Sequence, residues 1–289
     1  MTDVLGTCTA WGDGVCVVVP DGDGPHDPVV IPLSDIVSGK PVPPRASTRL
    51  RVTPAEAQRR ALALWPDLET EPLGDWLLRR SRTATARRAN SVLAMAPSGL
   101  ADGYERVVAF YENLGQRPIA AVLPDSAEDA LFAEHGWVLE SDDDHTVFEI
   151  AGVAAARRTL SGVALPVAEV SLHGDDRLVT ARVTDQGRVV ASGVAGYPDD
   201  WVGFRGIEVE PTERGRGLGL LVMSDLLAWG AELGATTAYL QVLGDNTRAH
   251  ALYDGLGFVE HHRYRYLAVP RQGLPPPRGG AVPLPSRRA

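Results

Sequence analysis

The segment EVEPTERGRGLG (residues 208–219) constrains the fold more than any other part of this sequence. A strand-like run rich in β-branched residues leads into it, Pro211 interrupts that run, and an apolar segment of helical length follows. Gly215, Gly217 and Gly219 are therefore expected in a strand-to-helix turn, where glycine lets the backbone approach a ligand closely. The first N–H groups of a helix have no partner within the helix, so such a turn can hold an anionic diphosphate. The alternative is that the glycines serve only the steric needs of the turn.

Two common phosphate-binding patterns do not fit this segment. No Gly-Lys-Ser/Thr follows it, as a Walker-type loop requires, and Ser224 and Asp225 stand beyond it where a dinucleotide fingerprint would continue with glycine. The turn therefore indicates some other phosphate-containing ligand.

The remaining pattern predicts a mixed α/β (α+β) protein with several folding units. Residues 1–45 contain short β-branched runs separated by turn formers, which favour a small β-barrel. Residues 50–151 and 160–269 each combine strands with helices, including a helix that begins at a Thr53 N-cap. The proline- and glycine-rich tail, residues 270–289, is expected to be disordered.

The two α/β blocks look like copies of each other. The segment ALFAEHGWV (residues 130–138) matches ALYDGLGFV (residues 251–259), and ENLG (residues 112–115) matches AELG (residues 231–234) at nearly the same spacing. Two matches in the same order predict a duplicated fold.

The glycine turn and the second copied segment resemble the GNAT superfamily of acetyl-CoA-dependent N-acyltransferases. Its first signature, Arg/Gln-x-x-Gly-x-Gly/Ala after a strand ending in Val-x-Pro, is filled by Arg214, Gly217 and Gly219. DNTRAHALYDGLGF (residues 245–258) resembles the second signature, an Asn followed by a short helix with Leu-Tyr and then Gly-Phe. The resemblance implies acetyl-CoA as the cofactor.

The resemblance also implies roles for individual residues. Backbone N–H groups of the turn would bind the pyrophosphate, the strand before it would pair with the pantetheine arm, and Asn246 would contact the cofactor beyond the next strand. These cofactor-binding candidates are Ile207, Val209, Arg214, Gly215, Arg216, Gly217, Leu218, Gly219, Leu220 and Asn246. Tyr253 would be the general acid for the departing thiolate, although a core aromatic is the plain alternative.

The general base is less defined. Gln241 stands five residues before Asn246, where many members that act on protein N-termini carry a glutamate, and an amide cannot accept a proton. Glu208 is the candidate base, with Glu210, a water chain or an acceptor of low pKa as alternatives.

The first block lacks the residues that carry this chemistry. Phe132 stands at the place of Tyr253, and LAMAPSGLADG (residues 93–103) has neither the basic residues nor the Gly-x-Gly of the turn. We therefore expect that the first half kept the fold and lost the cofactor site. The whole layout resembles bacterial acetyltransferases with an SH3-like barrel before two GNAT-type halves, including members labelled N-acetylglutamate synthase-like and mycothiol synthase, on stretches such as ARRANSVL (residues 86–93) and IVSGKPVPPR (residues 36–45).

Composition excludes several other classes. The net charge of −9 argues against nucleic-acid binding, and no apolar run is long enough to span a membrane. We expect a cytoplasmic monomer or homodimer, without a metal, whose Cys8 and Cys16 are reduced.

The predicted function is transfer of an acetyl group from acetyl-CoA to a primary amine of a small molecule or peptide, by direct attack in a ternary complex. The acceptor would lie between the two halves, near residues 197–201 and Trp76. The alternative is a non-catalytic coenzyme A-binding module that recognises a partner through its barrel.

Overall fold

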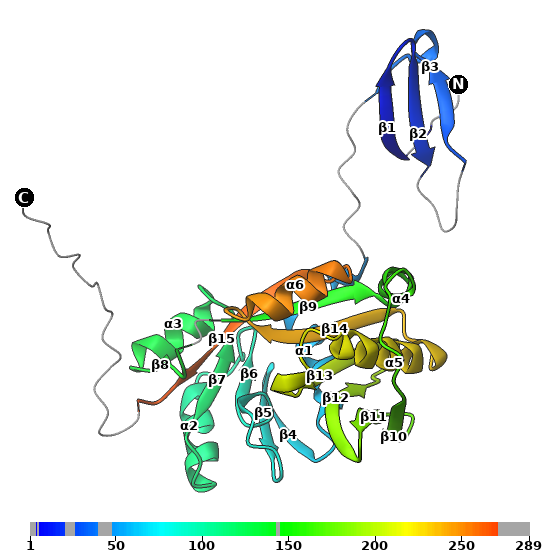
Figure 1. Ribbon diagram of the computed structural model, residues 1–289. Helices are drawn as coiled ribbons and strands as arrows, with labels where there is room; N and C mark the ends of the chain where they lie inside the picture. The colour runs from blue at the N-terminus through cyan, green and yellow to red at the C-terminus, as the bar shows by residue number, and fades with distance from the viewer. Residues whose placement is uncertain (1–3, 5, 21–26, 40–47, 143–144, 271–289) are drawn as a thin grey trace, which may run out of the picture. The chain divides into compact units, whose positions relative to one another are not determined.

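A computed structural model of the chain describes residues 4, 6–20, 27–39, 48–142 and 145–270 (Figure 1). The chain forms two compact units, Met1–Ala46 and Ser47–Ala289. The predicted tail lies outside the described residues except for Pro270. No helix of the described part has the length and apolar character needed to cross a bilayer.

The described part of the first unit is a three-stranded antiparallel sheet in the order β1-β2-β3, followed by one 3-10 turn. Its elements are β1 (Gly6–Gly12), β2 (Val15–Pro20), β3 (Val29–Pro32) and η1 (Leu33–Asp35). The predicted closed barrel is therefore wrong for this part of the chain, because three strands this short cannot close on themselves. Cys8 and Cys16 are free thiols on adjacent strands, with 3.7 Å between their Sγ atoms.

The second unit is built on one large mixed sheet. Its strands are β4 (Leu68–Leu73), β5 (Trp76–Ser81), β6 (Val92–Ala94), β7 (Ile119–Val122), β8 (Val138–Leu139), β9 (Thr146–Gly152), β10 (Val170–Gly174), β11 (Leu178–Asp185), β12 (Arg188–Gly196), β13 (Trp201–Val209), β14 (Thr237–Leu243) and β15 (Val259–Ala268). Its helices are α1 (Pro54–Arg60), α2 (Gly103–Asn113), α3 (Ala127–Glu134), α4 (Val153–Ser161), α5 (Leu218–Glu232) and α6 (Thr247–Gly255). Short 3-10 turns are η2 (Thr48–Arg51), η3 (Ala61–Leu64), η4 (Arg87–Ala89) and η5 (Pro211–Glu213).

The halves repeat one order of elements and exchange their last strands. The first half runs β6-α2-β7-α3-β9 and the second β13-α5-β14-α6-β15, with β8 as an extra short strand after α3. In each half the two strands around the long helix pair in parallel. However, β14 pairs with β9 of the first half, whereas β15 pairs with β9 and β7. The sheet order β10-β11-β12-β13-β14-β9-β15-β7-β6-β5-β4 is therefore continuous through both halves (Figure 1).

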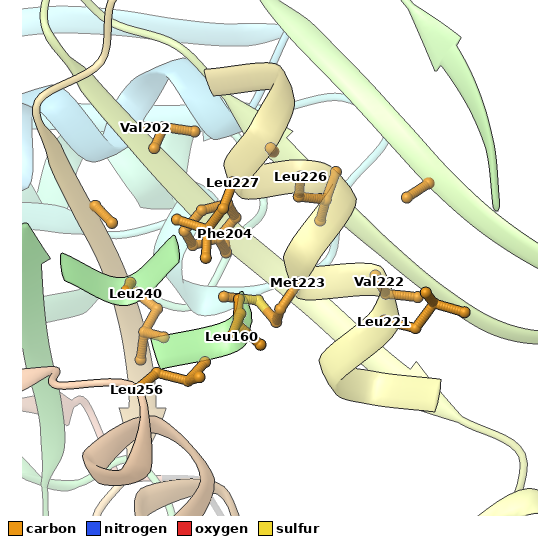
Figure 2. Packing of buried hydrophobic residues seen from close by; sticks show 14 of the residues in the cluster. Leu160, Val202, Phe204, Leu221, Val222, Met223, Leu226, Leu227, Leu240 and Leu256 are labelled. Atoms are coloured by element: carbon orange, nitrogen blue, oxygen red, sulfur yellow. The ribbon is translucent and has the colours of Figure 1, made fainter. Parts of the chain in front are cut away.

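Helix α5 provides much of the core of the second half. Its sequence is apolar on several faces, and Met223, Leu226 and Leu227 are fully buried. Figure 2 shows Leu227 beside Phe204 of β13 and Met223 near Leu160 of α4, and all of these residues belong to one core cluster with Leu240 of β14. This packing fixes the start of α5 against the end of β13, where the glycine turn lies.

Most predicted elements are present in the structure. The predicted N-cap is confirmed, since the Thr53 hydroxyl accepts a hydrogen bond of 3.2 Å from the Glu56 N–H at the start of α1. Helix α4 and strand β4 were not predicted.

Candidate active site

Strands β13 and β14 separate in the middle of the sheet. They pair in parallel only from Trp201 with Thr237 to Phe204 with Leu240. The next residues of β13 contain a bulge against β12, and Gly206 there has a φ of +58°. A bulge bends a strand and re-aims it, so β13 turns away from β14 after Phe204. The backbone groups along this gap are therefore available to a ligand.

A cavity of about 1000 Å³ lies beside this gap. It is bounded by β12, the end of β13, the glycine turn, the start of α5 and one face of α6. Its lining residues are Val189, Val190, Ala191, Ser192, Ile207, Glu208, Val209, Glu210, Pro211, Glu213, Arg214, Gly215, Gly217, Leu218, Gly219, Leu220, Asn246, Arg248, Ala249, Leu252 and Tyr253. Among the predicted site residues, Arg216 is the one absent from this lining.

The glycines of the turn are required by their backbone conformation. Gly215 and Gly217 have φ values of +81° and +79°, in the left-handed region that favours glycine. A Cβ atom on Gly217 would also lie 3.1 Å from Cδ of Pro166. The steric reason for glycine therefore holds at Gly215 and Gly217.

The start of α5 is suited to hold an anion. Gly217 is its N-cap and supplies no side-chain acceptor. The hydrogen bonds of the helix begin at Leu221, whose N–H donates to the Gly217 carbonyl at 3.0 Å. The N–H groups of Leu218, Gly219 and Leu220 are thus available at the positive end of the helix dipole. The cavity, the unpaired strand edge and this helix start together fit a long cofactor with a diphosphate, as coenzyme A is.

The two arginines of the turn are exposed. The Arg214 Nε donates to the Val209 carbonyl at 3.2 Å, which leaves the rest of its guanidinium at the cavity wall. Arg216 instead pairs with Glu213 and is absent from the cavity lining. Arg248 on α6 also lines the cavity and was not predicted, although it follows Asn246 by only two residues.

Asn246 and Tyr253 lie at opposite ends of α6. The Asn246 side chain is the N-cap of this helix, accepting from the Ala249 N–H at 3.1 Å, and it also borders the cavity. Tyr253 lies in the last turn of the helix and packs near Phe258. Burial, with a smaller contribution from the negative charge of Glu149, raises the pKa of Tyr253 to about 12. The phenol therefore keeps its proton at neutral pH.

A buried acid behind Tyr253 was missed by sequence reasoning. Glu149 of β9 is 3% exposed, and its Oε1 lies 2.6 Å from Nδ1 of His250 on α6. The Nε2 atom of His250 donates its proton to the Leu243 carbonyl at 3.1 Å. The contact between Nδ1 of His250 and Oε1 of Glu149 therefore holds a second proton, which the two side chains share. Burial raises the pKa of Glu149, and its Oε2 has no hydrogen-bond partner among the described residues. Sequence could not place it here because Glu149 belongs to the first half and reaches α6 only through the exchanged strand.

The candidate bases differ in position from Gln241. Glu208 and Glu210 are exposed carboxylates at the cavity wall. Gln241 does not line this cavity, and its Oε1 accepts from the Tyr264 hydroxyl. Two aromatics expected near the acceptor lie elsewhere: Trp76 and Trp201 are buried in separate core clusters and do not line this cavity.

Comparison with known proteins shows the family of this chain. The model of the family described as probable histone acetyltransferase Rv0428c C-terminal matches residues 56–267, which is most of the chain. A Bacillus subtilis protein named uncharacterized N-acetyltransferase YobR is 26% identical over 239 residues, covering 72% of this chain and 96% of that protein. The probable histone acetyltransferase Rv0428c of Mycobacterium tuberculosis is 28% identical over 230 residues, covering 74% of this chain and 73% of that protein.

A solved structure supports the same fold. A GCN5-related N-acetyltransferase from Kribbella flavida superposes with a TM-score of 0.59 at 16% identity, over 76% of this chain and 96% of that one. The matched family model, with these relatives and the shared fold, identifies the chain as an acetyltransferase of the GNAT superfamily, whose members use acetyl-CoA. Within that superfamily, the chain belongs to the family described as probable histone acetyltransferase Rv0428c C-terminal.

Proposed function

We propose that this protein transfers an acetyl group from acetyl-CoA directly to a primary amine of a small molecule or peptide. The observation that carries the proposal is the juxtaposition of an uncapped helix start, an unpaired strand edge and a protonated tyrosine around one cavity. The two halves are a duplicated fold in which the second half alone carries the cofactor site.

Cofactor binding falls to the backbone. The N–H groups of residues 214–220 hold the diphosphate, and Arg214 adds a positive charge beside it. Ile207 and Val209 offer their main-chain groups to the pantetheine amides along the open edge of β13. Asn246 completes the wall at the start of α6. The two sides of the cavity thus align the thioester along the gap between β13 and β14.

The reaction needs one proton to be delivered and one to be removed. Acetyl-CoA supplies the acetyl group as a thioester, whose carbonyl carbon the amine attacks and whose sulfur leaves as a thiolate. Tyr253 holds the proton that this sulfur takes. Glu208, exposed on the cavity wall, receives the proton that the amine nitrogen loses when the N–C bond forms. A main-chain N–H of β13 at the gap stabilises charge on the carbonyl oxygen.

A non-catalytic coenzyme A-binding module with a partner-recognising N-terminal unit is the second candidate function. The hydroxyl of Tyr253 favours catalysis, because a binding module gains nothing from a protonated phenol in the cavity. The name of the mycobacterial relative adds a histone to the acceptors that should be tested beside small amines.

Thiol release from acetyl-CoA, followed over a panel of small amines, peptides and a histone, tests the proposal. We expect at least one acceptor to give turnover. When both substrate concentrations are varied, double-reciprocal plots of the initial rate should give intersecting lines, since direct transfer requires both substrates to be bound. Parallel lines would indicate a covalent acetyl-enzyme and contradict direct transfer. Tight coenzyme A binding without turnover on any acceptor would favour the binding module instead.

A further inference from the structure

A second cavity lies at the point where β13 and β14 separate. Its volume is about 190 Å³, and it is lined by Leu64, Trp65, Arg88, Phe204, Arg205, Gly206 and Gln241. Phe204 and Leu240 form the last parallel pair before the gap, and Arg205 and Gln241 are the residues directly after it. The large cavity begins at Ile207, the next residue of β13 after Gly206. The linings of the two cavities therefore adjoin along β13, at the place where it separates from β14.

Both halves build this second cavity. Leu64, Trp65 and Arg88 come from the first half, whereas the β13 and β14 residues come from the second. The volume is below the roughly 300–1,000 Å³ typical of sites for drug-sized ligands. It therefore suits a small molecule, or one end of a larger one, rather than a folded partner.

The cavity is positively charged in a protein of net charge −9. Two of its lining residues are arginines, and none of them is an acid or a histidine. Arg88 donates to the Tyr264 hydroxyl at 3.3 Å and to the Gln241 carbonyl at 3.4 Å, so both of its recorded acceptors are neutral. The Nε of Arg205 donates to the Leu64 carbonyl at 2.8 Å, which is also a neutral acceptor.

Arg205 differs from comparable arginines of the same unit. Three arginines lie over aromatic rings in the described residues: Arg60 over Trp201, Arg87 over Tyr266, and Arg205 over Trp65 at 4.6 Å. Arg60 is paired with Asp200 and Glu56, and Arg87 with Glu140. No ion pair with Arg205 or Arg88 is recorded in the described part of the chain. The negative charge of Asp67 acts on Arg205, but the Oδ2 atom of Asp67 is already an acceptor for Ser81 and Thr83.

We propose that this cavity binds the acceptor, and that the acceptor is a small amine carrying a carboxylate held by Arg205 and Arg88. This inference rests on the proposed function. Stacking on Trp65 fixes the plane of the Arg205 guanidinium, and a planar guanidinium matches a carboxylate with two parallel hydrogen bonds. A carboxylate anchored there directs the rest of the molecule, and its amine, toward the gap between β13 and β14. The same charges repel a lysine-rich peptide.

The test compares the twenty protein amino acids with their carboxamides as acceptors, using the full chain and thiol release. We expect turnover with one or more amino acids and a KM at least about tenfold higher for the matching carboxamide, since a hydrogen-bonded charge contributes this much or more. Arg205→Gln should raise the KM for the amino acid by a similar factor and leave that for the carboxamide unchanged. Arg60→Gln is the matched control, because Arg60 has the same stacking but lies outside the cavity; it should change neither KM.

A binding measurement separates this inference from the proposed function. Thermal unfolding in the presence of coenzyme A, with each amino acid and its carboxamide, reports binding without chemistry. Stabilisation of the wild type by an amino acid, but not by its carboxamide, and loss of that effect in Arg205→Gln would support the cavity even if no turnover were seen. Equal effects of both ligands, an unchanged response in Arg205→Gln, or no stabilisation by any amino acid would overturn it. Unchanged coenzyme A affinity in Arg205→Gln shows that the variant is folded.

Discussion

The turns before α2 and before α5 occupy the same place in their halves, but their surroundings differ. The turn before α5 borders the large cavity with two glycines in left-handed conformation. Beside the turn before α2, the space is taken by side chains: a Cβ on Gly103 would lie 2.9 Å from the Ser98 hydroxyl and 3.4 Å from the Trp76 ring. The indole of Trp76 donates to the Ala96 carbonyl at 2.6 Å, which holds the filled arrangement in place.

The strands and the last helix are also more closely packed in the first half than in the second. Strands β6 and β7 pair over the whole length of β6, whereas β13 and β14 separate after Phe204. Phe132 of α3 is fully buried, with ring centroids of Trp76 and Trp137 at 5.6 and 4.6 Å, while Tyr253 of α6 borders a cavity. The first half is therefore packed with aromatic side chains where the second half has an open strand edge and a cavity.

The largest expected effect is that of Gly217→Glu. A side chain at a φ of +79° is strained, its Cβ meets Pro166, and its carboxylate repels the diphosphate. We expect the dissociation constant of coenzyme A to rise at least about 100-fold, which corresponds to ~2.7 kcal/mol. Titration calorimetry measures it. Gly99→Glu, at a φ of +75° in the turn of the first half, is the matched control and should leave coenzyme A binding unchanged.

Tyr253→Phe should separate catalysis from binding. Loss of a general acid lowers turnover by about 100-fold or more, whereas the ring and its packing against Phe258 remain. Steady-state kinetics should show the drop in kcat, and titration should show unchanged coenzyme A affinity. Equal kcat values for the two proteins would exclude Tyr253 as the acid.

The reciprocal change, Phe132→Tyr, asks whether the hydroxyl alone restores a site in the first half. We expect no second coenzyme A site, because the neighbouring space is filled by Trp76 and Trp137. The buried hydroxyl should instead lower the free energy of unfolding by about 1–3 kcal/mol. Denaturant unfolding measures this loss, and titration gives the number of sites. Two sites would show that the hydroxyl, and not the packing, distinguishes the halves.

The smallest effect concerns β15, the strand that joins the halves. His262 lies within hydrogen-bond distance of Gln58 of the first half, and burial lowers its pKa to about 3. In the unfolded chain, His262 takes up a proton below its ordinary pKa of 6.5, whereas in the folded protein it stays neutral down to about pH 3. The free energy of unfolding therefore falls as the pH decreases from about 6.5 toward 3. The expected slope is at most about 1.4 kcal/mol per pH unit. Thermal unfolding between pH 7.5 and 5 should show it, and His262→Gln should flatten the slope.

Sequence reasoning was most successful where local signals are strong. The Thr53 cap, the strand before the glycine turn and the apolar α5 follow from capping, β-branching and periodicity, and the cavity gathers almost all of the predicted site residues. The exchange of β9 and β15 could not be predicted, because local pattern does not specify which half a strand pairs with. Glu149, Arg88 and Arg205 were missed for the same reason, since their roles depend on contacts between the halves.

Hydrogen exchange of backbone amides, with and without coenzyme A, locates the cofactor on the chain. We expect coenzyme A to slow exchange at residues 207–209 and 214–220 and to leave residues 93–103 of the first half unchanged. Protection at the first-half turn, or no protection at residues 214–220 under saturating coenzyme A, would contradict this expectation.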